Sequence, residues 1–214
     1  MADKIQLNSR KDLHLFRKAW HIFFGSLVAF GYFYFFSKLQ IIILLTLSLL
    51  FYVVMEIIRF NSAAFNAWAM KRAKWLVRDC EVHKIQSGIY FSISTLLSIL
   101  FFPKLIAVLS ILYLGYGDPT ASFFGILWGK HGPSFRNGKS WIGTFAGMVI
   151  CSLWTVIFLR DLPLTLGPIC IISLLGGIAA GGIEALNLKV DDNLSVPLLS
   201  GLVLWGLFKF FEIY

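Results

Sequence analysis

An aspartate stands inside one of the long apolar segments of this sequence. Asp118 lies in the second half of the segment from Leu105 to Trp128, where an ionised carboxylate costs about 2.5–3.5 kcal/mol on membrane-insertion scales. Residues that break or loosen a helix surround it: Gly115, Gly117, Pro119 and Gly125. At membrane depth such residues are tolerated chiefly where the backbone lines a cavity or packs on protein. We therefore expect a discontinuous helix that opens onto water, with a purely structural ion pair as the alternative role of Asp118.

A glycine-rich basic segment, "GKHGPSFRNGKS", follows directly. Glycines let backbone amides approach an anion and basic side chains supply charge, a pattern typical of phosphate binding. The candidate residues are Gly129, Lys130, Arg136, Lys139 and Ser140. The segment is not a Walker A loop, because Pro133 occupies the place of its first glycine and no β-strand precedes it. A plain basic turn is the alternative, and the proximity of Asp118 in the sequence favours phosphate binding.

A third polar cluster lies near the end of the sequence. Glu184 ends one apolar run, and Asp191, Asp192 and Asn193 precede the next. Mg²⁺ prefers one or two carboxylates together with water and substrate phosphates, so the cluster predicts a magnesium site. The same Asp-Asp-Asn sequence is also a favourable helix N-cap. The cluster alone does not decide between these two roles.

Long apolar runs must position these polar groups. The chain of 214 residues is 58% hydrophobic and only 14% charged, whereas soluble domains are about 25% charged. Because the runs are continuously apolar, they indicate membrane helices and not the strands of a barrel. The runs cover about residues 20–37, 39–58, 85–102, 105–128, 141–159, 166–186 and 196–213. We predict an all-α, polytopic membrane helical bundle of about seven transmembrane helices, forming a single domain over residues 1–214.

Lysine and arginine residues concentrate in alternate loops. Positive residues near the ends of spans stay in the cytoplasm, which predicts a cytoplasmic N-terminal segment at residues 1–18 and a cytoplasmic loop at residues 60–84. Asp118, the Gly/Lys segment and the Asp-Asp-Asn cluster then all face the cytoplasm. The net charge of +8 is explained by this topology and by attraction to anionic lipid or phosphate. Nucleic acid is not expected as a partner.

Several features flank this predicted site. Residues 65–81 have one apolar and one basic face, which predicts an amphipathic helix on the inner leaflet, although a simple connector explains most of the pattern. Arg17 with His21, and Glu56 with Arg59, share helical faces near span ends. We expect both pairs to add to a cytoplasmic rim of charges, with interfacial anchoring as the alternative. The small residues of 176–182 predict close helix packing.

The motifs together resemble a known family. "GDPTASFFGILWGKHG" followed by "GKSWIGT", with "RKAWH" near the start and "DDNLSVPLLSG" near the end, is similar to the membrane-bound diacylglycerol/polyprenol kinases. This family includes dolichol kinase, phytol kinase and the CTP-dependent diacylglycerol kinases, and phosphatidate cytidylyltransferase is a more distant relative. One departure is Ile142, which stands where many members have glutamate. The likeness extends over nearly the whole chain.

The resemblance implies roles for the polar residues. Catalytic roles would belong to Asp118, Asp191 and Lys139, and metal ligation to Asp118, Asp191 and Asp192. The residues expected to contact the nucleotide are Gly117, Gly125, Gly129, Lys130, Arg136, Ser140, Gly143 and Asn193. In this arrangement the basic side chains offset the negative charge that develops during phosphoryl transfer.

The expected function is an integral-membrane lipid kinase with a cytoplasmic active site, in a bacterial inner membrane or an ER-type membrane. It would transfer the terminal phosphoryl group of a nucleoside triphosphate to a lipid alcohol such as diacylglycerol, a polyprenol or phytol, with Mg²⁺. CTP as the donor is implied by the resemblance, and ATP is the alternative. A phosphatidate cytidylyltransferase, which Ile142 and the short chain disfavour, and a small anion transporter are the other functions considered. The sequence leaves the lipid and the oligomeric state open.

Overall fold

The structure is a computed structural model, and it describes residues 15–73, 82–135, 137–186, 188 and 190–213. Within those residues every regular element is a helix. The α-helices are α1 Leu15–Phe30, α2 Lys38–Asn61, α3 Ala63–Arg72, α4 Ser87–Phe101, α5 Lys104–Leu112, α6 Asp118–Trp128, α7 Trp141–Leu159, α8 Leu166–Ala185 and α9 Asp192–Phe210. Two π-helical segments, η1 Gly31–Phe35 and η3 Tyr113–Gly117, and a short 3₁₀ turn, η4 Gly129–His131, complete the described elements. The all-α prediction is confirmed.

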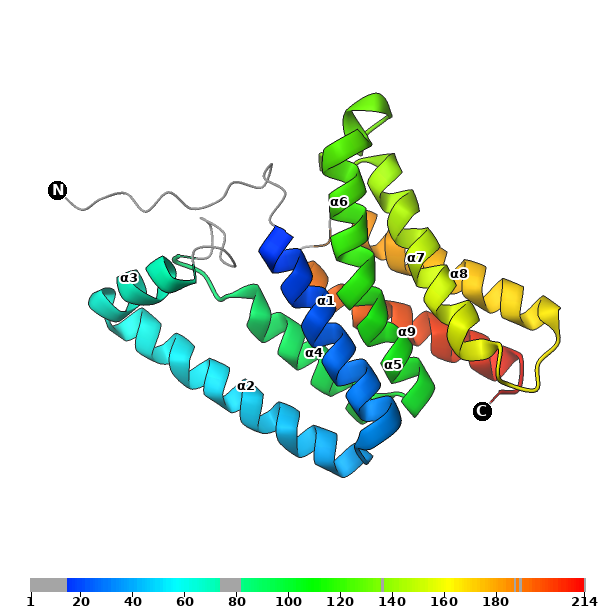
Figure 1. Cartoon of the computed structure of the whole chain (residues 1–214), viewed down its shortest axis with the longest axis horizontal. Coiled ribbons are helices and arrows are strands. Elements are labelled where there is room, and N and C mark those ends of the chain that lie inside the picture. The colour runs from blue at the N-terminus through cyan, green and yellow to red at the C-terminus, as the bar shows by residue number, and fades with distance from the viewer. Residues whose placement is uncertain (1–14, 74–81, 136, 187, 189, 214) are drawn as a thin grey trace.

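Helix α5 forms the centre of the bundle. All of its residues from Leu105 to Leu112 are buried, and burial continues through Tyr113 and Leu114 of η3. A helix that is apolar on all sides must be surrounded by other helices, and α5 contacts α1, α4, α7 and α9. Figure 1 shows α2 on one side of the molecule, α7 and α8 on the other, and α4 between α2 and the central helices.

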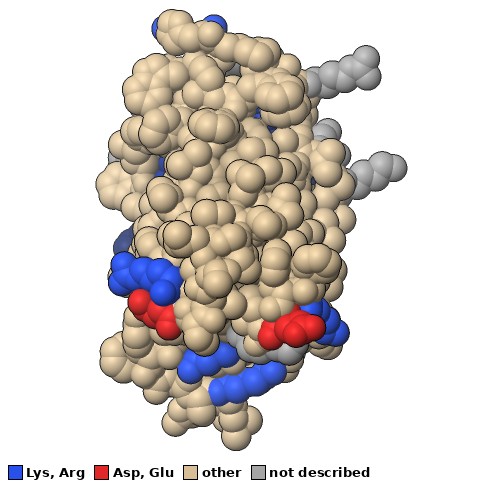
Figure 2. Space-filling model, turned by 90° about the vertical axis from the view of Figure 1, so that its right-hand side faces the viewer, with Lys and Arg blue, Asp and Glu red and all other residues tan. Residues whose placement is uncertain are grey.

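Each of the predicted apolar runs is helical in the structure. By length and composition, four helices can cross a membrane: α2, α7, α8 and α9. Large apolar side chains cover the outside of the bundle. In α2, only 17% of the apolar stretch that could cross the membrane is buried inside the protein. Figure 2 shows a wide band of uncharged side chains on one face, with most of the charged side chains visible there gathered below it. This surface matches a protein embedded in lipid.

Small residues set the spacing of α6, α7 and α8. A Cβ atom on Gly177 would lie 2.5 Å from the Met148 carbonyl oxygen, and one on Gly143 would lie 2.3 Å from the Ala121 carbonyl oxygen. Neither position accepts a side chain, so the helices approach backbone to backbone there. The predicted close packing of residues 176–182 is confirmed at Gly176, Gly177 and Gly181, whereas Gly182 has open space beside it.

The loop after α2 begins as the sequence predicts. Helix α3 covers the first half of the expected amphipathic helix, and residues 74–81 lie outside the described part of the chain. On α3 the buried residue is Met70, while Trp68 is half exposed, stacks on Phe65 and is covered by the Arg72 guanidinium. The exposed aromatic side chains fit a helix that lies at a membrane surface.

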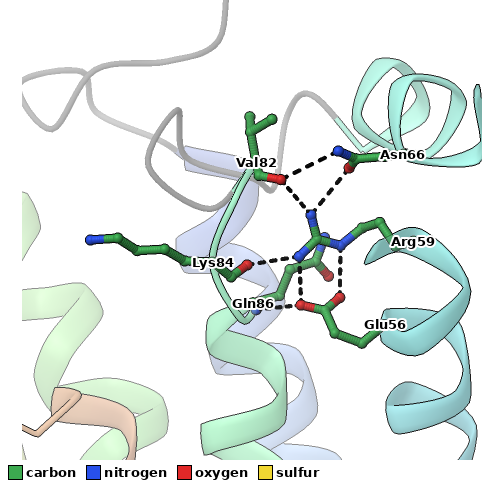
Figure 3. A network of polar contacts seen from close by, with 6 residues as sticks. All are labelled: Glu56, Arg59, Asn66, Val82, Lys84 and Gln86. Carbon is green, nitrogen blue, oxygen red and sulfur yellow. Dashed lines mark hydrogen bonds and ion pairs between the residues drawn. The ribbon is translucent and has the colours of Figure 1, made fainter. Parts of the chain in front are cut away.

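A buried polar network ties α2, α3 and the start of α4 together (Figure 3). The Arg59 guanidinium donates to both carboxylate oxygens of Glu56, at 2.6 and 2.8 Å. It also donates to Asn66 Oδ1 and to the carbonyl oxygens of Val82 and Lys84, at 2.7–3.1 Å. A guanidinium has five N–H donors, and these bonds use all of them. Glu56 and Arg59 therefore form a structural junction, and the expectation that they join a rim of ligand-binding charges is wrong.

Candidate active site

Asp118 is the first residue of α6, directly after the π-helical segment η3. The expected break in the helix is wrong, because the backbone stays helical from Lys104 to Trp128 and widens into a π-helix just before Asp118. Pro119 cannot donate a backbone hydrogen bond to the preceding turn, and a π-helical turn is a common way for a helix to absorb such a defect. Asp118 is therefore part of a continuous helical segment, and its side chain is half-buried.

A close backbone contact holds this π-helical segment in place. A Cβ atom added to Gly25 of α1 would lie 3.0 Å from Gly115 Cα, and one added to Gly115 would lie 3.2 Å from Gly25 Cα. The two glycines therefore let α1 and η3 touch directly. A Cβ atom on Gly117 would lie 2.8 Å from Cys151 Sγ, so Gly117 provides room for the same packing. The glycines before Asp118 position the carboxylate through packing and not through a chain break.

A small cavity connects Asp118 to Glu184. It is narrow: its empty space, counted together with open solvent at its edge, is about 170 Å³, and its walls include Gly117, Gly147, Gly181 and Val196 from η3, α7, α8 and α9. A Cβ atom on Gly147 would lie 3.1 Å from Ala121 Cβ and 3.3 Å from the Gly117 carbonyl oxygen, so the glycine lets α7 approach η3 and α6 beside Glu184. Glu184 is 7% exposed. The sequence placed Glu184 in an acidic cluster without giving it a role in the site, and the structure puts it at the centre.

Lys139 is the cation at this acidic centre. Its Nζ atom donates to Asp192 Oδ2 at 2.8 Å, contacts the Glu184 carbonyl oxygen, and lies 3.7 Å from Glu184 Oε1. Burial lowers the pKa of Lys139, but the carboxylates of Glu184, Asp192 and Asp118 outweigh it, so the net shift of this pKa is upward. Lys139 therefore remains protonated at neutral pH and offsets the repulsion among the three carboxylates.

The Gly/Lys loop is folded against the end of α8. Asn137 Nδ2 donates to the Ala185 carbonyl oxygen at 2.9 Å, and Asn137 Oδ1 accepts from the Lys139 backbone amide at 3.1 Å. Gly138 has φ of +82°, a left-handed conformation that favours glycine. The Phe135 and Trp141 rings stack at 4.7 Å across the loop. These contacts aim Lys139 at the carboxylates, which a disordered basic turn would not do.

Several residues expected to contact a nucleotide have packing roles. The Ser140 hydroxyl accepts from the Gly143 backbone amide at 3.0 Å and so caps α7. Cβ atoms on Gly125 and Gly129 would lie 3.0 and 2.9 Å from Ser140 Oγ. These three glycines and Ser140 therefore seat α6 against α7. Lys130 is exposed beside them, and Arg136 lies outside the described residues.

The two aspartates of the Asp-Asp-Asn cluster make different contacts: one caps a helix and the other contacts Lys139. Asp191 is the N-cap of α9, because its Oδ1 atom accepts from the backbone amide and the side-chain amide of Asn193, at 2.9 and 2.7 Å. Asp192 faces Lys139 instead. Asn193 is buried and bonded to the cap. Asp192 is thus the member of the cluster that belongs to the acidic centre.

Lys18 is a residue that the sequence analysis did not assign. Its Nζ atom is buried, lies 5.7 Å from the centre of the Phe123 ring, and is attracted by the Asp118 carboxylate. Among the described residues it has no hydrogen-bond partner. Helix α1 begins at Leu15, before the predicted span, and this places Lys18 opposite α6. In the sequence, a lysine at the start of a span indicates only membrane topology. Its position near Asp118 could be recognised only from the tertiary structure.

The site fits Mg²⁺ that is bound together with a nucleotide, and not Mg²⁺ that is held by protein ligands alone. In the described part of the chain, no three side chains of His, Cys, Asp or Glu come together as a metal-binding group. Mg²⁺ commonly takes one or two carboxylates and fills its other positions with water and phosphate oxygens. Asp118 and Asp192, both half-buried beside Glu184, offer such a pair.

Comparison with known proteins gives the family. The chain is 31% identical over 160 residues to CTP-dependent diacylglycerol kinase 1 of Schizosaccharomyces pombe, covering 70% of this chain and 73% of that protein. It is 24% identical over 214 residues to the Saccharomyces cerevisiae protein of the same name, covering 92% and 74%. It is 36% identical over 104 residues to phytol kinase of Synechocystis, covering 47% and 43%.

No protein-family model and no solved structure matches the chain. The identity to the fission-yeast kinase, over most of both chains, is sufficient by itself. It agrees with a helical bundle in which Lys139 and its carboxylate partners lie at the end of long apolar helices. The chain belongs to the diacylglycerol/polyprenol kinase family of membrane lipid kinases.

Proposed function

We propose that this protein transfers the γ-phosphoryl group of CTP to the hydroxyl group of diacylglycerol, with Mg²⁺, at the Asp118–Lys139–Asp192 centre. The observation that carries the proposal is Lys139, a cation held among three carboxylates by a loop that the structure orders. Diacylglycerol and CTP are favoured because they stand in the names of the yeast relatives. Phytol is the alternative acceptor, from the name of the cyanobacterial relative.

In this reaction the lipid hydroxyl oxygen forms a bond to the γ-phosphorus. The bond from the γ-phosphorus to the bridging oxygen breaks, CDP leaves with the electron pair, and the hydroxyl proton passes to a carboxylate. Protonated Lys139 stabilises the charge that builds up on the phosphoryl oxygens. Lys130, from the same loop, adds positive charge where the phosphates enter, and Arg136, which lies outside the described residues, is expected from the sequence to contribute as well.

The carboxylates serve two purposes in this proposal. Asp118 and Asp192 hold Mg²⁺, which when bound neutralises phosphate charge and orients the γ-phosphoryl group for in-line transfer. Glu184 lies behind them, with its carboxylate lining the cavity next to Asp118. Phosphate oxygens compete with Asp192 for Lys139, so binding of the nucleotide frees Asp192 Oδ2 for the metal ion. Asp191 and Asn193 keep α9 capped, and so hold Asp192 in position.

We also propose seven membrane crossings with a cytoplasmic N-terminal segment and a cytoplasmic site. Support comes from three helical segments besides the four long helices: α1–η1, α4 and α5–η3–α6. The π-helical turns divide two of these segments, yet residues 104–128 still extend about 37 Å at 1.5 Å per residue. The Gly/Lys loop and the start of α9 meet at one end of the bundle, which the charge rule assigns to the cytoplasm.

Purified protein in nanodiscs with diacylglycerol and CTP labelled at the γ-phosphate tests the proposed reaction. We expect labelled phosphatidate and free CDP, with no product when Mg²⁺ is chelated. Release of labelled pyrophosphate with formation of a CDP-lipid from phosphatidate would instead identify a cytidylyltransferase. Consumption of nucleotide in nanodiscs that contain neither a lipid alcohol nor phosphatidate would contradict both reactions.

A further inference from the structure

A groove between α1, α2 and α4 is separate from the Asp118 cavity. Its empty space, counted together with the open solvent at its mouth, is about 510 Å³. Trp20 and Phe24 of α1, Tyr52 of α2, and Gly88 and Phe91 of α4 are among its walls. Helix α2, whose apolar stretch is only 17% buried, forms one wall of the groove through Leu45, Ser48 and Tyr52. An apolar chain can therefore enter it from the bilayer.

Polar contacts at both ends keep this groove open. At one end, Arg17 Nη2 donates to Ser87 Oγ at 2.9 Å, and Glu56 Oε1 accepts from the Gln86 backbone amide at 3.0 Å. At the other end, Lys38 Nζ donates to the Leu100 carbonyl oxygen at 3.0 Å. The network of Figure 3 thus fixes α2 to α4 beside the groove. Helix α2 is held at both ends and cannot close the space between them.

An unsatisfied hydroxyl group indicates the chemistry of the occupant. Thr95 is 1% exposed and lines the groove, and among the described residues no atom forms a hydrogen bond with its Oγ1 atom. A buried hydroxyl without a partner is unfavourable, and in lipid no water offsets the loss. An ester carbonyl oxygen would accept this hydrogen bond. A lipid alcohol without ester groups has only its reacting hydroxyl oxygen as an acceptor, and phosphoryl transfer requires that oxygen at the Asp118 site.

Only a thin wall separates the groove from the active-site cavity. The Phe91 ring borders the groove and packs against the cluster of Leu114, Ile183 and Val196, and Val196 also lines the Asp118 cavity. The His21 ring meets Phe91 edge to face, with centroids 5.7 Å apart. The backbone of His21 lies against Gly115 of η3, three residues before Asp118. A lipid in the groove is therefore close to the carboxylates.

We propose that the α1–α2–α4 groove binds the acyl chains of a diacylglycerol acceptor, with Thr95 donating a hydrogen bond to an ester carbonyl oxygen and Phe91 separating the chains from the phosphoryl-transfer cavity. This assignment rests on the proposed kinase function. It deepens that function, because it selects a glycerolipid over an isoprenoid alcohol. Thr95 is a specificity residue in this arrangement, and Phe91 is a positioning residue.

Two substitutions test the groove by kinetics in nanodiscs. Gly88→Phe fills it, since the nearest atom to a Cβ there is Tyr52 Cε1 at 3.8 Å. We expect the KM for diacylglycerol to rise at least tenfold with the KM for CTP unchanged. Gly206→Phe, at an exposed position of α9 with nothing within 4 Å, is the matched control and should change neither value. Equal KM values for diacylglycerol in the two variants would overturn the proposal that the groove binds the lipid.

Thr95→Val preserves shape and tests the ester contact. Loss of one neutral hydrogen bond corresponds to about a fivefold rise in KM, expected for diacylglycerol and absent for phytol. Ser94→Ala is the control, because the Ser94 hydroxyl already donates to the Phe91 carbonyl oxygen at 3.0 Å. An equal change for both lipids would overturn the ester contact.

A direct readout separates this proposal from the kinase function. Diacylglycerol carrying a diazirine on an acyl chain should crosslink wild-type protein to peptides that contain Phe24, Tyr52 or Phe91, and Gly88→Phe should abolish those crosslinks. Crosslinks confined to other helices would overturn the groove even in an active enzyme. Groove crosslinks in a protein that phosphorylates no lipid would uphold the binding site and reject the kinase reaction.

Discussion

Two ion-pair clusters among the described residues, Arg59 with Glu56 and Lys139 with its carboxylates, differ in whether all of their hydrogen-bonding groups are used within the protein. Arg59 uses all five of its N–H donors on Glu56, Asn66 and two backbone carbonyl oxygens, and the ion pair is buried. Lys139 forms ion pairs with Asp192 and Glu184, is attracted by Asp118, and has a side chain that is 30% exposed. The saturated cluster can only hold helices together, whereas the unsaturated one can exchange partners with a ligand. Whether a cluster has a structural or a chemical role therefore depends on whether its charged groups can still bind a ligand, and not on charge alone.

The largest effect is expected at the unsaturated cluster. Asp118→Asn should lower kcat about 1000-fold, since it removes a charge needed only when Mg²⁺-nucleotide is bound. The unfolding temperature in detergent should change little. Asp161→Asn, at an exposed position paired only with Arg160, is the matched control. Near-normal turnover in Asp118→Asn would reduce Asp118 to a structural role.

The saturated cluster should show the opposite pattern. Arg59→Met should destabilise the protein by about 3–5 kcal/mol, because it leaves Glu56 buried without its cation. The protein that remains folded should keep its KM for CTP and most of its kcat. Thermal unfolding and kinetics on the monodisperse fraction measure both quantities, with Arg160→Met as the exposed control. A selective loss of CTP binding would show that Arg59 contacts the nucleotide.

The two neighbouring aspartates allow a sharper comparison. Asp192→Asn should raise the Mg²⁺ concentration for half-maximal activity about tenfold, because Asp192 accepts a hydrogen bond from Lys139 at the candidate active site. Asp191→Asn should shift it less than threefold, because asparagine also caps helices well. Metal titrations at saturating CTP give both values. Equal shifts would mean that both residues hold the metal ion, or that neither does.

A smaller effect should appear at the helix cap between the clusters. Ser140→Ala should lower stability by about 1 kcal/mol through loss of the α7 cap. If the hydroxyl acts only as a cap, the KM for CTP should stay within about twofold. A tenfold or greater rise in KM with unchanged stability would assign Ser140 to nucleotide binding.

The charge state of Lys139 gives the subtlest test. Its pKa is raised above 10.5, so its ionic contribution to stability is complete below that pH and is lost as the pH rises through the folded-state pKa. At pH 8, acetic anhydride should therefore acetylate Lys139 more slowly than exposed Lys130. Asp192→Asn should speed the modification of Lys139. Equal rates in both proteins would show that Asp192 does not hold the ammonium group.

The sequence by itself determined the helices. Continuous apolar runs of membrane length leave a chain no other way to satisfy its backbone in lipid, so their positions followed from composition alone. It also located most of the polar centre, because a carboxylate within an apolar run and a Gly/Lys loop are unusual there. Asp118 and Lys139 were identified in this way, whereas Asp192 came from the Asp-Asp-Asn cluster, which the sequence left open between a metal site and a helix cap.

Only the tertiary structure decided which charges belong together. Lys18 looked like a topology signal until α1 packed against η3 through Gly25 and Gly115. The expected break at Asp118 became a π-helical turn, because helical packing keeps the backbone bonded around Pro119. Glu56 and Arg59 looked available until their partners appeared from segments far along the chain. Whether all hydrogen-bonding groups of a side chain are used depends on residues that folding brings together, and this cannot be predicted from spacing along the sequence.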